Sequence, residues 1–332
     1  MTSTGMQIQY NFIEAELNHP FSLYPAICLH EAYPTGEGFY IFGEKENSKV
    51  LTIGPEGYFY QDNSSEEPKL AMGCALCVVY LPPTNKLRNI PWLPIKINNK
   101  VYFSECYTCT LVGSTNLCRC SKAKREFVST YTLLEIHYAV VECGYKVRIL
   151  QSLIYLTSEK IFSDFYRCLS AFKLRYEKPS VNQDLQEYLL EVNQSMGFSG
   201  TELELTEDNI KPNTSLRTAI KSILNIGVGK FGQNKDKNFV SYIDNSEELN
   251  DIMCNPDLDV KQCFMVTDKI IQIVAAKKKE TLPPNKSANV LLNAYTTAHG
   301  RLYLDKAIRK TLKAGGGLAY CDTDSILGKI VL

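Results

Sequence analysis

The chain has 332 residues, of which 45% are hydrophobic and 22% charged, as expected for a globular protein of one large domain or two to three small ones. Lys plus Arg and Asp plus Glu both number 36, so any groove for nucleic acid must be a local patch. No apolar run reaches the ~20 residues of a membrane span, and the N-terminus lacks a secretory-signal layout. We therefore predict a soluble intracellular protein without a membrane partner, whose 12 cysteines are thiols or metal ligands.

The first segments of the chain are turn-rich and strand-like. Residues 1–19 contain no motif that we can place. The next motif, Ser22-Leu23-Tyr24-Pro25, taken alone predicts a strand end stopped by proline. Residues 33–38 are rich in turn formers. Apolar runs then predict strands at residues 39–42, 57–60 and 71–80. The last run contains Cys74 and Cys77, which we interpret as core residues because free cysteine packs as a small hydrophobe.

Four cysteines lie close together in the sequence: Cys106, Cys109, Cys118 and Cys120. Their spacing suits a tetrahedral Zn²⁺ site with a structural role, and the alternative is four unlinked thiols in a loop. Residues 93–95 and 100–103 predict flanking strands. Lys122, Lys124 and Arg125 form a basic patch that suits phosphate contacts or, equally, a solvated helix start. Residues 126–143 are predicted to be a helix.

Helical periodicity dominates the next part of the chain. We predict helices at residues 162–176 and around 185–192, and a third that begins at Ser215 and ends at Gly227 and Gly229. In the third helix, Arg217, Lys221 and Asn225 recur every four residues and share a face that suits an anion, while Ile220, Ile223 and Leu224 are predicted to pack on another face. The alternative for the polar face is a solvated basic surface.

Residues 234–285 are predicted to be a strand-rich insertion, with strands at 239–243 and 263–276 and Lys277-Lys278-Lys279 at a loop tip. Residues 287–310 predict a long helix. We interpret His299 in that helix as a structural residue, because it has no acid or thiol at ligand spacing. Residues 315–317, three glycines, predict a flexible turn.

Residues 318–327 predict a strand that turns into a second strand. Side chains alternate along a strand, so Asp322 and Asp324 are expected on one face with Tyr320. Two close carboxylates repel unless a cation lies between them, and their oxygens suit Mg²⁺ or Mn²⁺. The alternative is a solvated surface turn, where Asp, Thr and Ser are common.

Three of these motifs together resemble family B DNA polymerases of the protein-primed type, most like the Maverick/Polinton, viral or organellar group. Residues 320–325, Tyr-Cys-Asp-Thr-Asp-Ser, resemble the metal-binding palm motif of that family. Ser22-Leu23-Tyr24-Pro25 resembles its first palm motif. Lys221, Asn225 and Gly229 resemble its fingers helix, and the cysteine segment resembles one found in the Maverick/Polinton group. The resemblance runs from about residue 20 to residue 327.

The resemblance implies an α+β fold: a right-hand polymerase palm with an antiparallel sheet, helical fingers and a strand-rich insertion, with exonuclease and thumb missing. It divides the chain into an unplaced segment (1–19), a first palm segment (20–45), an insertion with the zinc knuckle (46–160), fingers helices (161–233), a second insertion (234–285) and the metal-binding palm (286–332).

The resemblance also implies the chemistry, namely template-directed dNTP addition by two-metal phosphoryl transfer. Asp322 and Asp324 would be catalytic residues that hold Mg²⁺ or Mn²⁺. Nucleotide binding would fall to Ser22, Leu23 and Tyr24 at the sugar and triphosphate, Arg217 and Lys221 at the triphosphate, and Asn225 at the nascent pair. The implied partners are primer-template DNA, dNTPs and a terminal priming protein, in replication of a mobile element or virus, and in the nucleus if the host is a eukaryote.

In the cysteine segment, Cys120 stands where the similar polymerases have a His. Three further positions, in the palm and fingers motifs, depart from the family pattern. His19 stands where the family has its first metal-binding Asp, Ile226 replaces a Ser and Val228 replaces a Tyr. A neutral imidazole supplies no charge to a two-metal site. The alternative to an active polymerase is therefore a non-catalytic remnant that binds DNA or nucleotide. A third hypothesis, a glycosyltransferase that uses Asp-x-Asp to hold a nucleotide-sugar metal, does not account for Lys221, Asn225 and Gly229.

Overall fold

The computed structural model describes residues 7–11, 23–46, 48–63, 67–82, 91–114, 116–177, 184–233, 237–278, 288–322 and 325–330. The chain forms two compact units, which we call the large unit (residues 1–228 and 291–332) and the small unit (residues 229–290). None of the helices in these described ranges has the length and apolar character that crossing a membrane requires.

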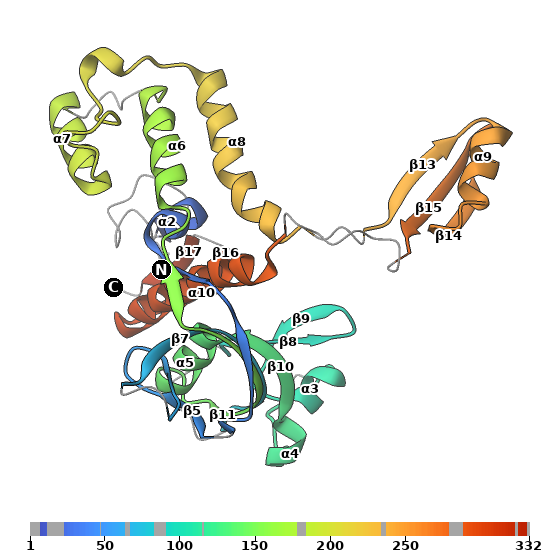
Figure 1. Cartoon of the computed structure of the whole chain (residues 1–332), viewed down its shortest axis with the longest axis horizontal. Coiled ribbons are helices and arrows are strands. Elements are labelled where there is room, and N and C mark those ends of the chain that lie inside the picture. Colours follow the sequence, from blue (N-terminus) through green and yellow to red (C-terminus); the bar gives the residue numbers. More distant parts are fainter. Residues whose placement is uncertain are drawn as a thin grey trace, which may run out of the picture. The chain divides into compact units, whose positions relative to one another are not determined.

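The large unit is built on a seven-stranded antiparallel sheet (Figure 1). Across the sheet the strands are β3 (Phe39–Phe42), β11 (Lys146–Tyr155), β7 (Lys69–Tyr80), β6 (Tyr58–Gln61), β5 (Lys49–Ile53) and β4 (Lys45–Glu46), and β10 (Phe127–Thr132) also pairs with β7. The predicted strands at 39–42, 57–60 and 71–80 are confirmed. Residues of β7 alternate between the core and the opposite face, so Cys77 is fully buried, as predicted, and Cys74 is half-buried.

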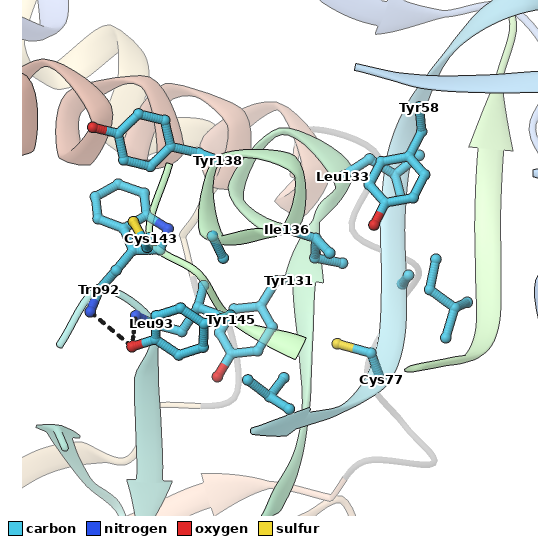
Figure 2. Packing of buried hydrophobic residues seen from close by; sticks show 14 of the residues in the cluster. Tyr58, Cys77, Trp92, Leu93, Tyr131, Leu133, Ile136, Tyr138, Cys143 and Tyr145 are labelled. Carbon is cyan, nitrogen blue, oxygen red and sulfur yellow. Dashed lines mark hydrogen bonds between the residues drawn. The ribbon is translucent and has the colours of Figure 1, made fainter. Parts of the chain in front are cut away.

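Helix α5 (Leu133–Val141) and the main sheet enclose the principal hydrophobic core (Figure 2). Leu133 and Ile136 of α5 lie among aromatic side chains from the strands and loops around them. The Tyr145 hydroxyl accepts hydrogen bonds from the backbone N–H of Trp92 (2.9 Å) and of Leu93 (3.4 Å). These bonds fix the segment that leads into strand β8 (Pro94–Ile97) to this core.

The predicted helix at residues 126–143 is wrong in its first half, because residues 127–132 form β10. These residues are β-branched or aromatic at most positions, a composition that fits a pleated surface. They pair with β7 from Phe127↔Val79 to Thr132↔Cys74. The helix begins only after Thr132, whose side chain forms a reciprocal capping box with Glu135.

The long helix α10 (Val290–Lys313) agrees with the predicted helix at 287–310. It is anchored to β7 through Tyr295, whose buried hydroxyl accepts from the Gly73 N–H (2.6 Å) and donates to the Gly73 carbonyl (3.0 Å). Gly73 has a φ of 132°, and a Cβ atom there would lie 1.9 Å from the Leu153 carbonyl oxygen. A glycine is therefore required where α10 meets the sheet.

Two short elements precede the main sheet. Helix α2 (Leu23–His30) is followed by β2 (Tyr33–Thr35), which pairs with β12 (Thr157–Glu159). The predicted turn at residues 33–38 is thus wrong in its first half, because a partner strand far along the chain recruits these residues into a ladder. The turn itself begins at Gly36, with a φ of 77°.

A helical region of the large unit comprises α6 (Ser163–Arg175), α7 (Leu185–Met196), the 3₁₀ turn η1 (Glu207–Asn209) and α8 (Thr214–Phe231). The predicted helices at 162–176 and 185–192 are confirmed. The third begins earlier than predicted, because the Asn213 side chain caps it by accepting from the Leu216 N–H (3.1 Å). Leu224 is buried and Ile220 packs against the same cluster, but Ile223 is 47% exposed, contrary to prediction.

A three-stranded antiparallel sheet contains β16 (Gly316–Asp322), β17 (Ser325–Ile330) and β1 (Gln7–Asn11), in the order β1-β17-β16. The predicted strand-turn-strand at 318–327 is confirmed, with Asp322 opposite Ser325 at the end of the hairpin. Of the predicted glycine turn, Gly315 (φ 81°) turns the chain, and the two glycines after it enter β16.

In its described residues, the small unit contains a sheet of order β13-β15-β14 and a short helix after β13. Its elements are β13 (Phe239–Ile243), α9 (Ser246–Met253), β14 (Leu258–Met265) and β15 (Ile271–Lys277). Strand β13 is as predicted. The single strand predicted at 263–276 is two strands, and α9 was not predicted. Lys277 ends β15, Lys278 is exposed beyond it and Lys279 lies outside the described residues.

Candidate functional site

Helix α2 contains the described part of the first predicted nucleotide motif. His19 and Ser22 lie outside the described residues, and Leu23 is the first residue of the helix. Tyr24 is partly buried, and it packs against Ala26 and Ile27, as does Tyr303 of α10. The prediction of a strand end here was wrong, because Pro25 lies in the first helical turn, where its missing N–H costs no hydrogen bond.

The end of α2 is tied to α10 by polar contacts. Glu31 accepts a hydrogen bond from the Tyr303 hydroxyl (2.6 Å), and its other carboxylate oxygen lies 3.5 Å from His299 Nδ1. His299 therefore has an acid partner, contrary to the sequence-based expectation, and that partner lies on an element remote in sequence. Burial lowers the pKa of His299, although the Glu31 carboxylate opposes this. Glu31 and His299 line a cavity of about 290 Å³ that also touches Glu56 and His137.

Helix α10 also leads into the hairpin that carries the predicted metal motif. Ala307 and Ile308 of α10 form a buried cluster with Ile326 of β17. Asp322 is the last residue of β16, but its side chain, and the whole of Asp324, lie outside what the structure describes. The structure therefore contains the predicted hairpin, and the expectation that the two carboxylates lie on one face stays a prediction.

Helix α8 carries the predicted triphosphate residues. The Arg217 Nε donates to Glu177 Oε1 (3.0 Å), and Lys173 Nζ lies 3.7 Å from Glu177 Oε2. Burial, followed by repulsion from Arg217 and Lys221, lowers the pKa of Lys173, and Glu177 opposes the shift. Lys221 is exposed, as is Asn225. Arg217 is therefore held by a carboxylate, and Lys221 offers an exposed charge one turn further along the same helix.

The two glycines of α8 lie inside the helix, contrary to the prediction that they end it. The Tyr166 hydroxyl donates to the Leu224 carbonyl (3.1 Å), and a Cβ atom on Gly227 would lie 2.8 Å from that hydroxyl oxygen. Gly227 thus permits the close approach of α6 and α8, a reason that the helix pattern alone does not reveal. Nothing lies within 4 Å of a Cβ atom built on Gly229.

The four predicted zinc ligands do come together. They lie on and around the short helices α3 (Tyr107–Leu111) and α4 (Lys122–Arg125), after the hairpin of β8 (Pro94–Ile97) and β9 (Lys100–Phe103). The sulfur atoms of Cys106, Cys109, Cys118 and Cys120 all lie within 4.8 Å of one another. Among the described residues, no other group of three or more Cys, His, Asp or Glu side chains is so placed that it could hold a metal ion. Four thiolates in this arrangement fit tetrahedral Zn²⁺.

Arg125 fixes the cysteine cluster to the sheet. Contrary to the predicted surface patch, its side chain is only 2% exposed, and it donates to Cys118 Sγ (3.4 Å) and to the Leu81 carbonyl (2.9 Å). The pKa of Cys118 is lowered to about 7, because hydrogen bonds from the Cys120 backbone and neighbouring thiols outweigh the opposing effect of burial. The hydrogen bond with Cys118 is the largest cause that raises the pKa of Cys109.

Comparison with known proteins identifies a fold similarity. No protein-family model matches the chain, and no curated protein matches it. Among solved structures, phi29 DNA polymerase in its orthorhombic crystal form superposes with a TM-score of 0.50 at 13% identity, over 94% of this chain and 38% of that one. Phi29 DNA polymerase complexed with primer-template DNA and incoming nucleotide gives 0.49 at 13% identity, over 99% and 39%. The chain therefore has a polymerase-like fold of helices and antiparallel sheets, and it spans less than two-fifths of the length of these structures.

Proposed function

We propose that this chain is the fingers and palm portion of a DNA-directed DNA polymerase of the protein-primed family B type, a nucleotidyltransferase that acts in DNA replication. The observation that carries the proposal is the β16–β17 hairpin, whose first strand ends at Asp322, within a fold that is polymerase-like over 94% of the chain. The motifs containing Tyr24, Lys221 and Asp322 occur in the order of that family. Primer-template DNA is the partner that the resemblance of these motifs implies.

In this proposal each residue has a separate task. Asp322 and Asp324 are carboxylates, the donor type that Mg²⁺ or Mn²⁺ prefers, and these ions would stabilise charge on the attacking and leaving oxygens. Lys221, with Arg217 beside it, attracts the dNTP triphosphate. Tyr24, which packs against the same two residues of α2 as Tyr303 of α10, contacts the sugar, together with the Ser22 and Leu23 backbone. Asn225 hydrogen-bonds at the nascent base pair. A terminal priming protein would supply the first hydroxyl group.

The cysteine cluster would have a structural role as a Zn²⁺ site. Its four sulfur atoms satisfy the ligand number and softness that zinc prefers, and no oxygen ligand or open position is needed. It is built on its own hairpin and helices, so it supports the insertion and does not take part in nucleotide transfer.

One residue favours a second function. His19 occupies the position of the first metal-binding Asp, so the second candidate is a non-catalytic DNA- or nucleotide-binding remnant of such a polymerase. The two candidate functions share the same fold and the same ligands, and they differ only in whether nucleotide transfer takes place. Restoring a carboxylate at position 19 therefore distinguishes them.

Primer extension tests the proposal directly. A primed template with dNTPs and Mg²⁺ or Mn²⁺ is incubated with the chain, with His19→Asp, and with His19→Asp combined with Asp324→Ala. We expect His19→Asp to extend the primer and Asp324→Ala to lower that rate by 10³-fold or more, on the order of 4 kcal/mol of transition-state stabilisation.

A matched control is Asp208→Ala, which removes a carboxylate from the turn η1, outside the predicted site residues, and is expected to leave extension unchanged. Lys221→Ala is expected to raise the KM for dNTP about tenfold, the effect of one lost charged contact. If the chain and His19→Asp both bind the template but neither extends the primer, the non-catalytic remnant becomes the better-supported function.

A further inference from the structure

The segment that carries the cysteine cluster is basic, although the chain as a whole is neutral. Residues 94–126 contain six Lys or Arg and two Glu, a net charge of +4, against zero for the 332 residues. Both acids are already engaged, since Glu105 lies 3.7 Å from Arg125 and Glu126 lies 3.4 Å from Lys122. The charge that remains is positive.

Four exposed cations in this segment have no ion pair with any side chain that the structure describes: Lys96, Lys100, Arg119 and Lys124. Lys96 and Lys100 lie on β8 and β9, Arg119 lies between two of the cysteines, and Lys124 lies on α4. We call these four cations, together with Val101, Phe103 and Tyr107, the knuckle surface. Its charge complements a polyanion.

Apolar and aromatic side chains are interleaved with these cations. All four residues of β9 are exposed, with Phe103 52% and Val101 62% exposed. The register pairs Lys96 with Val101 and Pro94 with Phe103, so Lys96, Val101 and Phe103 share one face of the hairpin. Lys100 pairs with Ile97 beside the turn, on the other face, and is itself exposed. Tyr107, at the start of α3, is 37% exposed. Exposing an aromatic ring to water is energetically unfavourable, and unpaired bases can stack on such rings.

The knuckle surface is held on a rigid support. Ile95 and Ile97 of β8 are buried in the main core. The turn between the strands is Asn98-Asn99, both with positive φ (50° and 62°), which is the tight two-residue geometry that matches strand twist. Tyr131 donates to the Pro94 carbonyl, and the Thr108 hydroxyl donates to the Lys124 carbonyl (2.7 Å). A rigid support lowers the entropy cost of binding.

We propose that the knuckle surface binds an unpaired DNA strand, with phosphates on Lys96, Lys100, Arg119 and Lys124 and bases stacked on Phe103 and Tyr107. The inference that this bound strand is the template rests on the proposed function. The binding itself does not, because it uses no residue of the predicted nucleotide site. A cationic surface with interleaved exposed rings suits a single strand, whose bases are free to stack.

Fluorescence anisotropy tests this with the full chain and a fluorescein-labelled 20-nucleotide oligo(dT), at several salt concentrations. Phe103→Ala is expected to raise Kd by about 5- to 100-fold, the effect of one lost base stack. Lys96→Gln with Lys100→Gln is expected to flatten the slope of log K against log salt by about 1.4, since each contact on a single strand contributes about 0.7. The second variant keeps the test valid if Phe103→Ala impairs folding.

Matched controls are Phe42→Ala, which removes another exposed phenylalanine (58%) from β3, and Lys45→Gln with Lys69→Gln, which removes two exposed lysines from β4 and β7. They are expected to stay within twofold of the wild-type Kd. Equal loss in knuckle and control variants would overturn the proposal, as would tighter binding of duplex DNA or of single-stranded RNA than of oligo(dT).

Primer extension separates this proposal from the proposed function. If the chain binds oligo(dT) in a way that depends on Phe103 but extends no primer, the knuckle-surface proposal is supported and the polymerase proposal is rejected. If the chain extends a primer and its binding of oligo(dT) is unchanged by substitution of Phe103 or of both lysines, the polymerase proposal is supported and the knuckle-surface proposal is rejected.

Discussion

The four cysteines of the knuckle lie within fifteen consecutive residues, whereas Tyr24, Lys221 and Asp322 are spread over most of the chain. The cysteine sulfurs converge through two short helices and one turn. Tyr24 and Asp322 instead depend on α10, which contacts the end of α2 through Tyr303 and packs on the hairpin through Ala307 and Ile308. A local site keeps its geometry when distant packing changes, and a distributed site does not. Perturbations should therefore separate the two.

Metal removal should have the largest effect, confined to the local site. We expect about one equivalent of zinc in the purified protein, and its loss in Cys106→Ser together with a destabilisation on the order of 4 kcal/mol, because the remaining thiolates repel without the cation. Plasma mass spectrometry measures the zinc and urea unfolding measures the stability.

The control for this experiment is Cys263→Ser, which changes an exposed cysteine of the small unit and is expected to alter neither quantity. Less than one equivalent of zinc, with Cys106→Ser as stable as the wild type, would leave four unlinked thiols as the correct interpretation of the cluster.

A pair of glycines in α8 tests the distributed site. Gly227→Ala places a methyl group 2.8 Å from the Tyr166 hydroxyl oxygen, and Tyr166 is buried between Phe162 and Phe165, so we expect about 1–3 kcal/mol of destabilisation. Gly229→Ala meets no atom within 4 Å and should stabilise the helix by about 0.5–1 kcal/mol. Urea unfolding followed by circular dichroism measures both. Equal effects would mean that α6 and α8 do not approach as closely as described.

The smallest expected effect concerns pH and the contact between α2 and α10. Burial lowers the pKa of His299 from its ordinary 6.5, while Glu31 opposes and Lys306 assists the shift. Below about pH 6.5 the unfolded state binds a proton that the folded state binds less well. Stability is therefore lost as the pH falls from about 6.5 towards the lowered pKa, and it is unaffected above about pH 6.5.

His299→Asn keeps a hydrogen-bond donor near Glu31 but does not titrate. We expect the wild-type Tm to fall between pH 7.5 and 5.5 by on the order of 2 °C more than that of the variant. The pKa of His30 is also lowered by burial, and it contributes equally to both proteins. Identical pH profiles would show that His299 is not buried against α2.

The local features of this chain were determined by its sequence. Apolar runs predicted β3 and β13 with their observed bounds and β7 within two residues, and helical spacing predicted α6 and α10. The spacing of the cysteines predicted a cluster that the structure assembles. These succeeded because strand and helix periods, and ligands separated by a few residues, are properties of one short segment.

The long-range features were decided by tertiary structure. Residues 127–132 became a strand because β7 offered a ladder partner, and Gly227 lies inside a helix because Tyr166 needs the space. Arg125 is buried because Leu81 and Cys118 accept from its guanidinium, and His299 meets Glu31 because α2 packs on α10. In each case the deciding partner is remote along the chain or lies on another element, and no local pattern encodes which surface a folded chain brings alongside.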